Sequence, residues 1–368
     1  MRKMKILSIF GTRPEAIKMA PLIKEMKFCD GIESVVCITA QHRDMLDQVL
    51  NVFDIKPEYD LNIMKPNQTL TQITIDVLKG IENIIIKEKP DLVLVHGDTS
   101  TAMAAALAAF YQKIKVGHVE AGLRTYDKYS PFPEEINRQI IDRVSDYLFA
   151  PTEISKNNLK LCSNKKQKIF VTGNTAIDAL KTTVDTEYRN VELDWVGSSK
   201  MILVTVHRRE NLGEPMKRIF EAMRKIVNDF TDVKIVYPVH LNPRVRKIAE
   251  EILGNNDRIK LIEPLDVVSF HNFMGRAYFI MSDSGGVQEE APSLGKPVLV
   301  LRNTTERPEG IEAGTLKLVG TDIDCIYDSA KELLNDDESY KRMSEAKNPY
   351  GDGSASKRIL NAILEDNK

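Results

Sequence analysis

Residues 278–290 read Tyr-Phe-Ile-Met-Ser-Asp-Ser-Gly-Gly-Val-Gln-Glu-Glu and carry the clearest fold signal in the chain. The apolar run at 278–281 is typical of a buried strand, and the segment 291–297 indicates a short helix with a glycine stop at Gly295. A strand, a Ser-Gly-Gly turn and a helix form the layout of a phosphate-binding loop. In such a loop the glycines let backbone N–H groups approach an anion that faces the positive end of the helix dipole. The stretch therefore predicts a phosphate site at Ser284, Gly285 and Gly286.

Two acids, Glu289 and Glu290, fall one turn into the predicted helix. A carboxylate in that place can accept hydrogen bonds from a ribose diol, as acidic residues do in other nucleotide sites. The alternative is an ordinary strand-to-helix turn, because pairs of glycines punctuate many loops. The local pattern leaves both interpretations open, and the rest of the chain has to decide between them.

Length and composition set the frame for that decision. A chain of 368 residues favours two domains, and 42% hydrophobic with 28% charged residues is typical of a soluble globular protein. The formal net charge is −2, from 51 basic and 53 acidic residues. This balance gives no electrostatic reason to expect nucleic acid or an anionic membrane surface as a partner.

The cysteines and the apolar runs indicate a cytoplasmic protein. The four cysteines form no CxxC pair and no zinc-like spacing with histidine, so free thiols in a reducing compartment are expected. The apolar run near the N-terminus is too short for the core of a signal peptide. No run approaches the roughly 18 apolar residues that a membrane span requires.

Strands alternate with helices along most of the chain, which predicts parallel sheets. The first half contains apolar strand candidates at 6–10, 35–39, 92–95, 115–119 and 147–150, and an Ala-rich helix at 101–111. A polar stretch at 185–200 interrupts the pattern and is interpreted as the connection to a second unit. Strand candidates then return at 201–206, 233–237, 259–262, 278–281, 298–301 and 316–319, and a helix at about 355–365 ends the chain. The expected fold is α/β, with two Rossmann-like doubly wound domains and a ligand site in the cleft between them.

Acidic residues follow several strands of the first half. Asp98 ends the strand at 92–95, Glu120 ends the strand at 115–119, and Glu134 precedes a helix in a Pro-rich loop. Arg13 and Lys18 follow the first strand. Asp98 has an alternative role as a helix N-cap or turn residue, and Glu134 has one as first-turn charge that complements a helix dipole.

Basic residues follow strands of the second half. His207, Arg208 and Arg209 end the strand at 201–206, and Arg307 follows the strand at 298–301. Such groups suit an anionic ligand, because charge-assisted hydrogen bonds are the strong ones, although Arg209 fits a solvated charge run equally well. GxGxxG and Walker A motifs are absent from the sequence, so neither NAD binding nor ATP hydrolysis is predicted.

Anion and diol groups in one half and carboxylates in the other suit a nucleotide sugar. The proton on C2 of such a sugar becomes acidic only after the C1–O bond to the diphosphate breaks and leaves an oxocarbenium-like centre. Cations that stabilise the departing phosphate, together with carboxylate bases, fit that order of events.

The motifs also resemble those of the non-hydrolysing UDP-N-acetylglucosamine 2-epimerases. The similarity covers about residues 5–315 and rests on the segments 11–22, 96–99, 118–124, 131–138, 172–175, 207–211, 282–290 and 305–310. These motifs are long and occur in the same order.

The resemblance implies a GT-B fold, with domains at 1–175 and 176–353 and a last helix, 354–368, that crosses back to the first domain. It implies reversible interconversion of UDP-GlcNAc and UDP-ManNAc without NAD or an essential metal, through elimination of UDP to a 2-acetamidoglucal and its re-addition. A homodimer and polysaccharide biosynthesis are implied in the same way.

The resemblance also implies a role for each matching residue. The acid/base carboxylates are expected to be Asp98, Glu120 and Glu134, and His207 is expected to assist the leaving diphosphate. The diphosphate contacts are expected at Arg13, Ser284, Gly285 and Gly286. The ribose is assigned to Glu290, the uracil to the backbone of Phe270, and a phosphate or nucleotide contact to Arg307, while Lys18 is placed among the substrate-binding residues.

One departure from the family concerns a second UDP-GlcNAc site that activates its bacterial members. Gln41, Arg208 and His240 are present, but Asp44 and Asn67 stand where a glutamine and an arginine are expected. The sequence thus leaves activation by substrate in question.

Three other functions share some of these features. A hydrolysing epimerase that releases UDP and ManNAc would use the same carboxylates, and a GT-B glycosyltransferase would use the same fold with an added acceptor. A non-catalytic nucleotide-sugar sensor would have no need of several acids beside the sugar.

Overall fold

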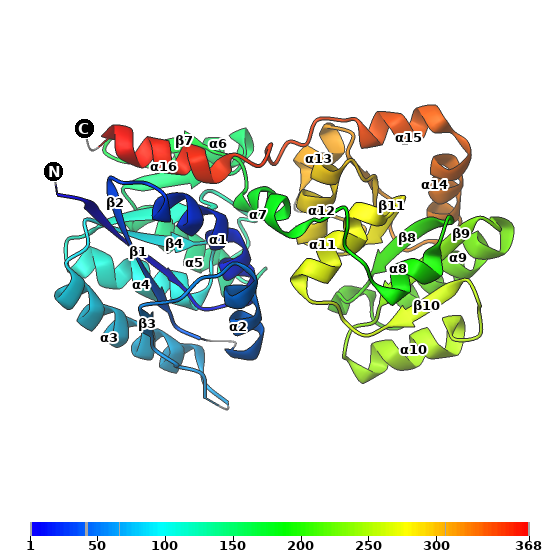
Figure 1. Ribbon diagram of the computed structural model, residues 1–368, viewed down its shortest axis with the longest axis horizontal. Helices are drawn as coiled ribbons and strands as arrows, with labels where there is room; N and C mark the ends of the chain where they lie inside the picture. Colours follow the sequence, from blue (N-terminus) through cyan, green and yellow to red (C-terminus); the bar gives the residue numbers. More distant parts are fainter. Residues whose placement is uncertain (1, 41–42, 66, 306, 367–368) are drawn as a thin grey trace. The chain divides into compact units, whose positions relative to one another are not determined.

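The computed structural model describes residues 2–40, 43–65, 67–305 and 307–366; the side chains of Asp44, Met45 and Arg209 are outside that description. The chain forms two compact units: Met1–Ala179 with Tyr350–Lys368, and Leu180–Pro349. Each unit is a twisted sheet with helices around it (Figure 1). These two α/β units with parallel sheets confirm the predicted fold class.

The sheet of the first unit has the strand order β3-β2-β1-β4-β5-β6-β7, and every neighbouring pair is parallel. The strands are β1 (Met4–Phe10), β2 (Ile32–Ile38), β3 (Tyr59–Asp60), β4 (Leu92–His96), β5 (Lys115–Val119), β6 (Tyr147–Ala150) and β7 (Lys168–Val171). The order reverses between β1 and β4, and ligands of such sheets bind at the carboxyl ends of the strands beside this reversal. Arg13 follows β1 and Asp98 follows β4, so both lie at that edge.

The helices of the first unit are α1 (Arg13–Lys27), α2 (Arg43–Val52), α3 (Leu70–Glu88), α4 (Ser100–Tyr111), α5 (Glu134–Val144), α6 (Glu153–Cys162), α7 (Thr175–Thr183), which runs into the second unit, and α16 (Ala355–Asp366). Helix α4 lies close to the sheet because its buried face consists largely of alanine. Pro21 lies inside α1, which continues to Lys27.

The last helix, α16, belongs to the first unit and packs against α1, although the whole second unit precedes it in the sequence (Figure 1). Ile359 and Ile363 are fully buried. The carboxylate of Asp178 on α7 accepts from the backbone N–H groups of Ala355 (3.1 Å) and Ser356 (2.8 Å), which have no partner inside the helix. The buried apolar face of α16 and the capping of its N-terminus by Asp178 therefore attach this helix to the first unit.

The sheet of the second unit has the order β10-β9-β8-β11-β12-β13, again parallel throughout. Its strands are β8 (Lys200–Thr205), β9 (Val233–Pro238), β10 (Ile259–Ile262), β11 (Phe279–Ser282), β12 (Val298–Val300) and β13 (Leu316–Leu318). Here the order reverses between β8 and β11. His207 and Ser284 follow these two strands and lie at the carboxyl edge of this sheet.

The helices of the second unit are α8 (Val191–Val196), α9 (Glu214–Asp229), α10 (Pro243–Leu253), α11 (Val267–Arg276), α12 (Gly285–Glu290), α13 (Pro308–Glu312), α14 (Ile323–Asn335) and α15 (Asp337–Ser344). Two 3₁₀ turns, η1 (Arg209–Asn211) and η2 (Ala291–Leu294), complete it. Apolar side chains of α9, α10 and α14 cover one face of the sheet, and those of α11 and α12 cover the other.

The structure corrects two sequence expectations. The polar stretch 185–200 is more than a connection, because it contains α8, which Asn190 caps by accepting from the N–H of Glu192 (2.9 Å). The helix predicted at 291–297 begins earlier, as α12 at Gly285, and only η2 occupies 291–294 before Gly295 ends it at φ +66°. Apolar periodicity did not reveal α8, which lies in a polar stretch behind an Asn cap, or the start of α12, which consists of two glycines.

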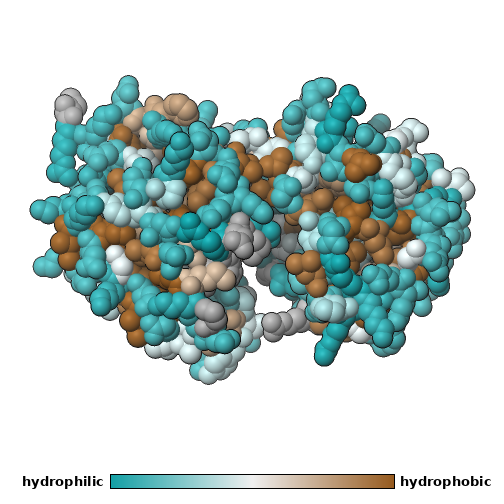
Figure 2. Space-filling view, turned by 60° about the horizontal axis from the view of Figure 1, so that its bottom comes forward, coloured by the Kyte–Doolittle hydropathy of each residue, from teal (hydrophilic) through white to brown (hydrophobic). Residues whose placement is uncertain are grey.

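The surface is mainly polar. On the face shown in Figure 2, hydrophilic residues predominate and hydrophobic ones form separate patches in both units. None of the helices in the described ranges is long and apolar enough to cross a membrane.

The docking of α16 gives a stability prediction. Ile359→Ala removes a fully buried side chain, and we expect it to lower the free energy of unfolding by about 3 kcal/mol, since buried Ile→Ala changes cost ~2–5 kcal/mol. Urea denaturation followed by circular dichroism measures this. Lys357→Ala, on the exposed side of the same helix, is the control and should change it by less than about 0.5 kcal/mol. Equal effects of the two variants would contradict the docking.

Candidate active site

The first unit brings Asp98, Glu120 and Glu134 together. They come from the turn after β4, the turn after β5 and the first residue of α5. The charges of Glu120 and Glu134 both raise the pKa of Asp98, which shows that the three carboxylates lie within electrostatic reach of one another. Three acids that the sequence places on separate segments thus form one cluster.

Asp98 is held by two residues of α5. Its carboxylate forms an ion pair with Arg138 (Nη2–Oδ2, 2.7 Å), and its carbonyl oxygen accepts from the side chain of Asn137 (2.9 Å). Burial is the largest cause of its raised pKa; Arg138 opposes the shift, and Glu120 and Glu134 add to it. Asp98 consequently keeps its proton to a higher pH than an ordinary aspartate.

Glu120 is paired with a cation. Its Oε1 forms an ion pair with Nζ of Lys18 and accepts from Nδ2 of Asn174 at 3.3 Å. Glu120 has φ +69°, a left-handed conformation that is uncommon for a residue with a side chain. The structure therefore places Lys18 beside the catalytic candidates.

Glu134 and His96 each present a buried polar atom to this region. Among the described residues, Oε2 of Glu134 and Nε2 of His96 have no hydrogen-bond partner. Burial lowers the pKa of His96 to about 3, so its imidazole is neutral near pH 7. Buried polar atoms without partners are rare in proteins, and an acceptor of this kind beside two other acids is available to a ligand.

Glu15 connects the turn after β1 to the turn after β4. It is buried, and its Oε2 accepts from the N–H groups of Gly11 (3.1 Å) and Thr12 (2.8 Å), while its Oε1 accepts from the hydroxyl of Thr99 (2.7 Å). Burial raises the pKa of this carboxyl group against the effect of these hydrogen bonds. Arg13 opens α1 directly after the turn that Glu15 fixes.

In the second unit, Asp283 fixes the segment that carries His207. The fully buried carboxylate of Asp283 accepts from the backbone N–H groups of His207 and Arg208 and from Nδ2 of Asn211, each at 2.9 Å. It also lies 3.3 Å from Nδ1 of His207. Asp283 therefore orients both the backbone and the ring of His207.

The ring of His207 is partly exposed and stacks on that of His240, with 5.9 Å between centroids and 13° between planes. Burial lowers the pKa of His207, Asp283 opposes the shift, and Arg208 and His240 add to it. An anion bound beside this ring would raise the pKa, because a negative neighbour favours the charged form.

Ser284, Gly285 and Gly286 form the turn into α12, where Ser284 is the N-cap residue. The N–H of Ser284 donates to Oγ of Ser282 (3.0 Å), and its carbonyl accepts from Gln288 (3.2 Å). A Cβ on Gly286 would lie 3.9 Å from the carboxylate of Glu290, so this glycine leaves the space beside that acid open.

The two acids of α12 differ in their surroundings. Glu289 is buried and forms an ion pair with Arg307 (Nη2–Oε1, 2.7 Å). Glu290 is 14% exposed and lies 3.7 Å from Nε2 of His271. His271 lies in the middle of α11 and bonds the hydroxyl of Thr183 (2.6 Å).

For four other residues of the sequence analysis the structure gives little or no information about a role. Phe270 packs on the core below α11, and its backbone N–H donates to the carbonyl of Asp266 (2.9 Å). Asn67 is exposed with φ +57°. Gln41 and the side chain of Asp44 lie outside the described residues, as does Glu306 in the motif that contains Arg307.

The sequence analysis assigned no role to several residues that the structure places at the site. They are Glu15, Asn137, Arg138, Asn174 and Asp283, and each lies inside a quoted motif. Their position within those motifs was the available signal. In the ranges that the structure describes, no group of three or more His, Cys, Asp or Glu residues is arranged to hold a metal ion.

Comparison with known proteins gives a uniform result. The family described as UDP-N-acetylglucosamine 2-epimerase matches residues 24–364. The UDP-N-acetylglucosamine 2-epimerase of Bacillus subtilis is 62% identical over 364 residues, which cover 99% of this chain and 96% of that protein.

Solved structures agree with these sequence matches. A crystal structure of a UDP-N-acetylglucosamine 2-epimerase has a TM-score of 0.94 and 59% identity, and covers 100% of this chain and 97% of its own. The enzyme from Neisseria meningitidis, crystallised with UDP-GlcNAc, has a TM-score of 0.88 and 51% identity, and covers 98% and 100%.

The pairing of Asp98 gives a prediction about its titration. Arg138→Met removes the cation that lowers the pKa of Asp98, so we expect this pKa to rise further. NMR titration of the ¹³C-labelled aspartate carboxyl groups measures it. Arg143→Met, on the same helix, is the control, because the Arg143 guanidinium bonds the carbonyl of Cys162. An unchanged or lowered pKa of Asp98 in Arg138→Met would contradict the assignment.

Proposed function

The chain belongs to the UDP-N-acetylglucosamine 2-epimerase family, and on this basis we propose that it interconverts UDP-GlcNAc and UDP-ManNAc reversibly, without releasing the sugar. The observation that carries the proposal is the cluster of Asp98, Glu120 and Glu134, with Lys18 and Arg138 as paired cations. Inverting a carbon centre requires a proton to leave from one face and return to the other. More than one acid/base group beside the sugar serves that purpose.

The proposed reaction has two balanced halves. In the first, the C1–O bond to the diphosphate breaks, and its electron pair leaves with UDP. A carboxylate then removes the proton from C2, and the C2–H electron pair forms the double bond of a 2-acetamidoglucal. In the second half a proton adds to C2 from the opposite face, and an oxygen of UDP attacks C1.

The protonation states of the cluster suit these two tasks. Glu120 is ion-paired with Lys18, and a neighbouring cation favours the carboxylate form that accepts a proton. Asp98 has a raised pKa, so it is the member of the cluster better suited to hold a proton and return it. Glu134, with a buried oxygen that has no partner among the described residues, completes the set.

The second unit supplies the groups proposed for UDP. His207 assists departure of the diphosphate: an anion beside the ring reverses the lowering of its pKa, and the resulting imidazolium donates a hydrogen bond to the leaving oxygen. Ser284, Gly285, Gly286 and Arg307 contact the phosphates, and Glu290 accepts from the ribose hydroxyls. Arg13 of the first unit is proposed as a further phosphate contact. Phe270 contacts the uracil. The complex of the Neisseria enzyme with UDP-GlcNAc supports the choice of ligand.

Isotope exchange tests the reaction. The enzyme incubated with UDP-GlcNAc in D₂O, with no acceptor added, should incorporate deuterium at C2 of both recovered UDP-sugars, measured by NMR and mass spectrometry. Stoichiometric free ManNAc would instead identify a hydrolysing epimerase. Absence of any exchange would leave a glycosyltransferase or a sugar-nucleotide sensor as the better description.

The division of labour between the units gives a mutational prediction. Glu120→Gln preserves the shape of a proton acceptor but removes its basicity, so kcat should fall about 100-fold or more while the UDP dissociation constant changes by less than about threefold. Glu290→Ala should do the reverse and weaken UDP binding about tenfold, or ~1.4 kcal/mol. Calorimetric titration with UDP and coupled kinetics measure both. Glu221→Ala, at an exposed position of α9, is the control, and near-normal turnover of Glu120→Gln would refute its role.

A further inference from the structure

We infer that His118 is a positioning residue that joins the three chain segments carrying Asp98, Glu120 and Glu134, an inference that rests on the proposed function. His118 lies on β5 and is fully buried, so it does not itself meet a ligand. One ring nitrogen contacts the turn that carries Asp98, and the other contacts α5, which carries Glu134. His118 itself lies on β5, the strand that leads to Glu120.

The first junction is with the turn that presents Asp98. Nε2 of His118 lies 2.7 Å from the carbonyl oxygen of Gly97. A carbonyl oxygen only accepts hydrogen bonds, so Nε2 carries the hydrogen and donates it. The N–H of Gly97 donates in turn to the carbonyl of Val119 (3.0 Å). Both sides of Gly97, which precedes Asp98, are therefore bonded to β5.

The second junction is with α5. Nδ1 of His118 lies 2.6 Å from Oδ1 of Asp142, a carboxylate that is 3% exposed. This contact joins the His118 ring to α5. Glu134, Asn137, Arg138 and Asp142 follow a spacing of three, four and eight residues along α5, which places them on one face of the helix. Fixing Asp142 thus sets the position of Glu134 and of the two residues that hold Asp98.

The third segment is the strand of His118 itself. Glu120 follows it by two residues, at the turn where φ reaches +69°. A Cβ on Gly97 would lie 3.5 Å from Oε2 of Glu120, so the Glu120 carboxylate rests directly over the turn that His118 holds. One side chain consequently fixes the spacing between Glu120 and the Asp98 turn.

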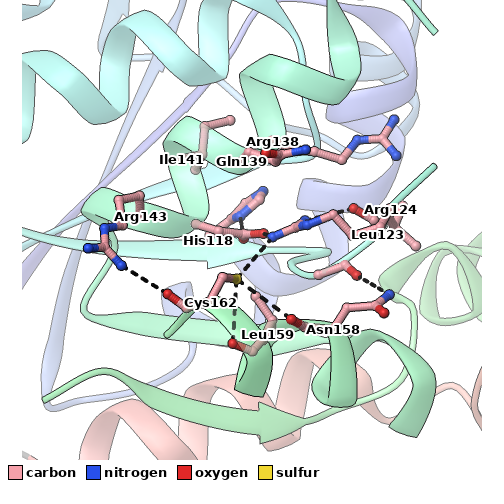
Figure 3. Close-up of polar contacts among 12 residues, drawn as sticks. His118, Leu123, Arg124, Arg138, Gln139, Ile141, Arg143, Asn158, Leu159 and Cys162 are labelled. Atoms are coloured by element: carbon pink, nitrogen blue, oxygen red, sulfur yellow. Dashed lines mark hydrogen bonds and ion pairs between the residues drawn. The ribbon is translucent and has the colours of Figure 1, made fainter. Parts of the chain in front are cut away.

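Asp142 also contacts Arg124 through its second carboxylate oxygen. Nη2 of Arg124 forms an ion pair with Oδ2 of Asp142 at 2.6 Å, and the Arg124 side chain is 4% exposed. Its guanidinium also donates to the carbonyl of Leu123 (2.7 Å) and to the thiol of Cys162 (3.5 Å). Figure 3 shows the His118 ring and the Arg124 guanidinium group lying close together. Arg124, Asp142 and His118 therefore form a continuous buried chain that ends at Gly97.

The functional consequence follows from the tolerance of proton transfer to geometry. A displacement of about 1 Å at a reacting group can reduce a rate about 100-fold. Loss of the His118 junctions should therefore slow the chemical step while leaving the UDP groups of the second unit unaffected. A residue that only stabilised the fold would instead reduce the amount of binding-competent protein.

Three substitutions separate the two junctions. His118→Phe removes both hydrogen bonds, and we expect kcat to fall about 100-fold with KM within threefold of the wild type. His118→Gln places an amide N–H near the position of Nε2 and restores the bond to Gly97, whereas His118→Asn places one near Nδ1 and restores the bond to Asp142. Each should recover about tenfold in kcat relative to His118→Phe.

Full-length wild type and variants are compared by kcat, KM, deuterium incorporation at C2, UDP affinity and stoichiometry, and thermal unfolding. Ser145→Ala is the matched control. It removes a buried hydrogen bond to the carbonyl of Ile141 at the C-terminal end of α5, and it should leave kcat within twofold of the wild type. A folded His118→Phe with kcat within threefold of the wild type would overturn the inference, as would equal losses of kcat and UDP binding. Failure of all three His118 variants to fold, while Ser145→Ala folds, would assign His118 to folding and overturn it too. Absence of deuterium exchange in the wild type would instead reject the proposed reaction.

Discussion

Carboxylates repel one another, and the first unit is built to hold three of them together. Burial strengthens that repulsion, because water no longer screens the charges. The structure offsets it with Lys18 beside Glu120 and Arg138 beside Asp98. The pKa of Asp98 is still raised, chiefly by burial and in smaller part by the charges of Glu120 and Glu134. The raised pKa of Asp98 suits it to hold a proton, which proton transfer at a carbon requires of one partner.

The second unit is proposed to bind an anion and release it again. Two of its buried acids already have partners. Asp283 accepts hydrogen bonds from the N–H groups of His207 and Arg208 and from Asn211, and it lies beside the His207 ring. Glu289 is ion-paired with Arg307. His207 has a lowered pKa and is therefore mostly neutral until a negative group approaches. The proposed leaving group thus creates the charge that stabilises it.

Much of this arrangement could be predicted from the sequence, because its strands are continuous apolar runs and its site residues follow them directly. Parallel strands buried on both faces give that signal, and it located β5, β6 and β10 to the residue. The short strand β3 and the capped helix α8 left no such signal. Asp98 and Glu120 could be proposed because they follow apolar strands, and Glu134 because it lies in a Pro-rich loop before a helix. Asp283 and His118 could not be given roles, since their partners lie far away in the sequence and only the folded chain brings them together. The same holds for the bond between Glu15 and Thr99, although Glu15 also bonds the nearby N–H groups of Gly11 and Thr12.

The return of α16 to the first unit has a consequence for biosynthesis. The second unit is, in effect, inserted between α7 and α16, so a ribosome delivers it complete while its host still lacks a helix. Residues 180–349 are contiguous and can fold as soon as they emerge. The N-terminal unit must wait, with the surface that receives Ile359 and the carboxylate of Asp178 uncovered, until α16 has left the exit tunnel. The unit translated first is thereby the one completed last.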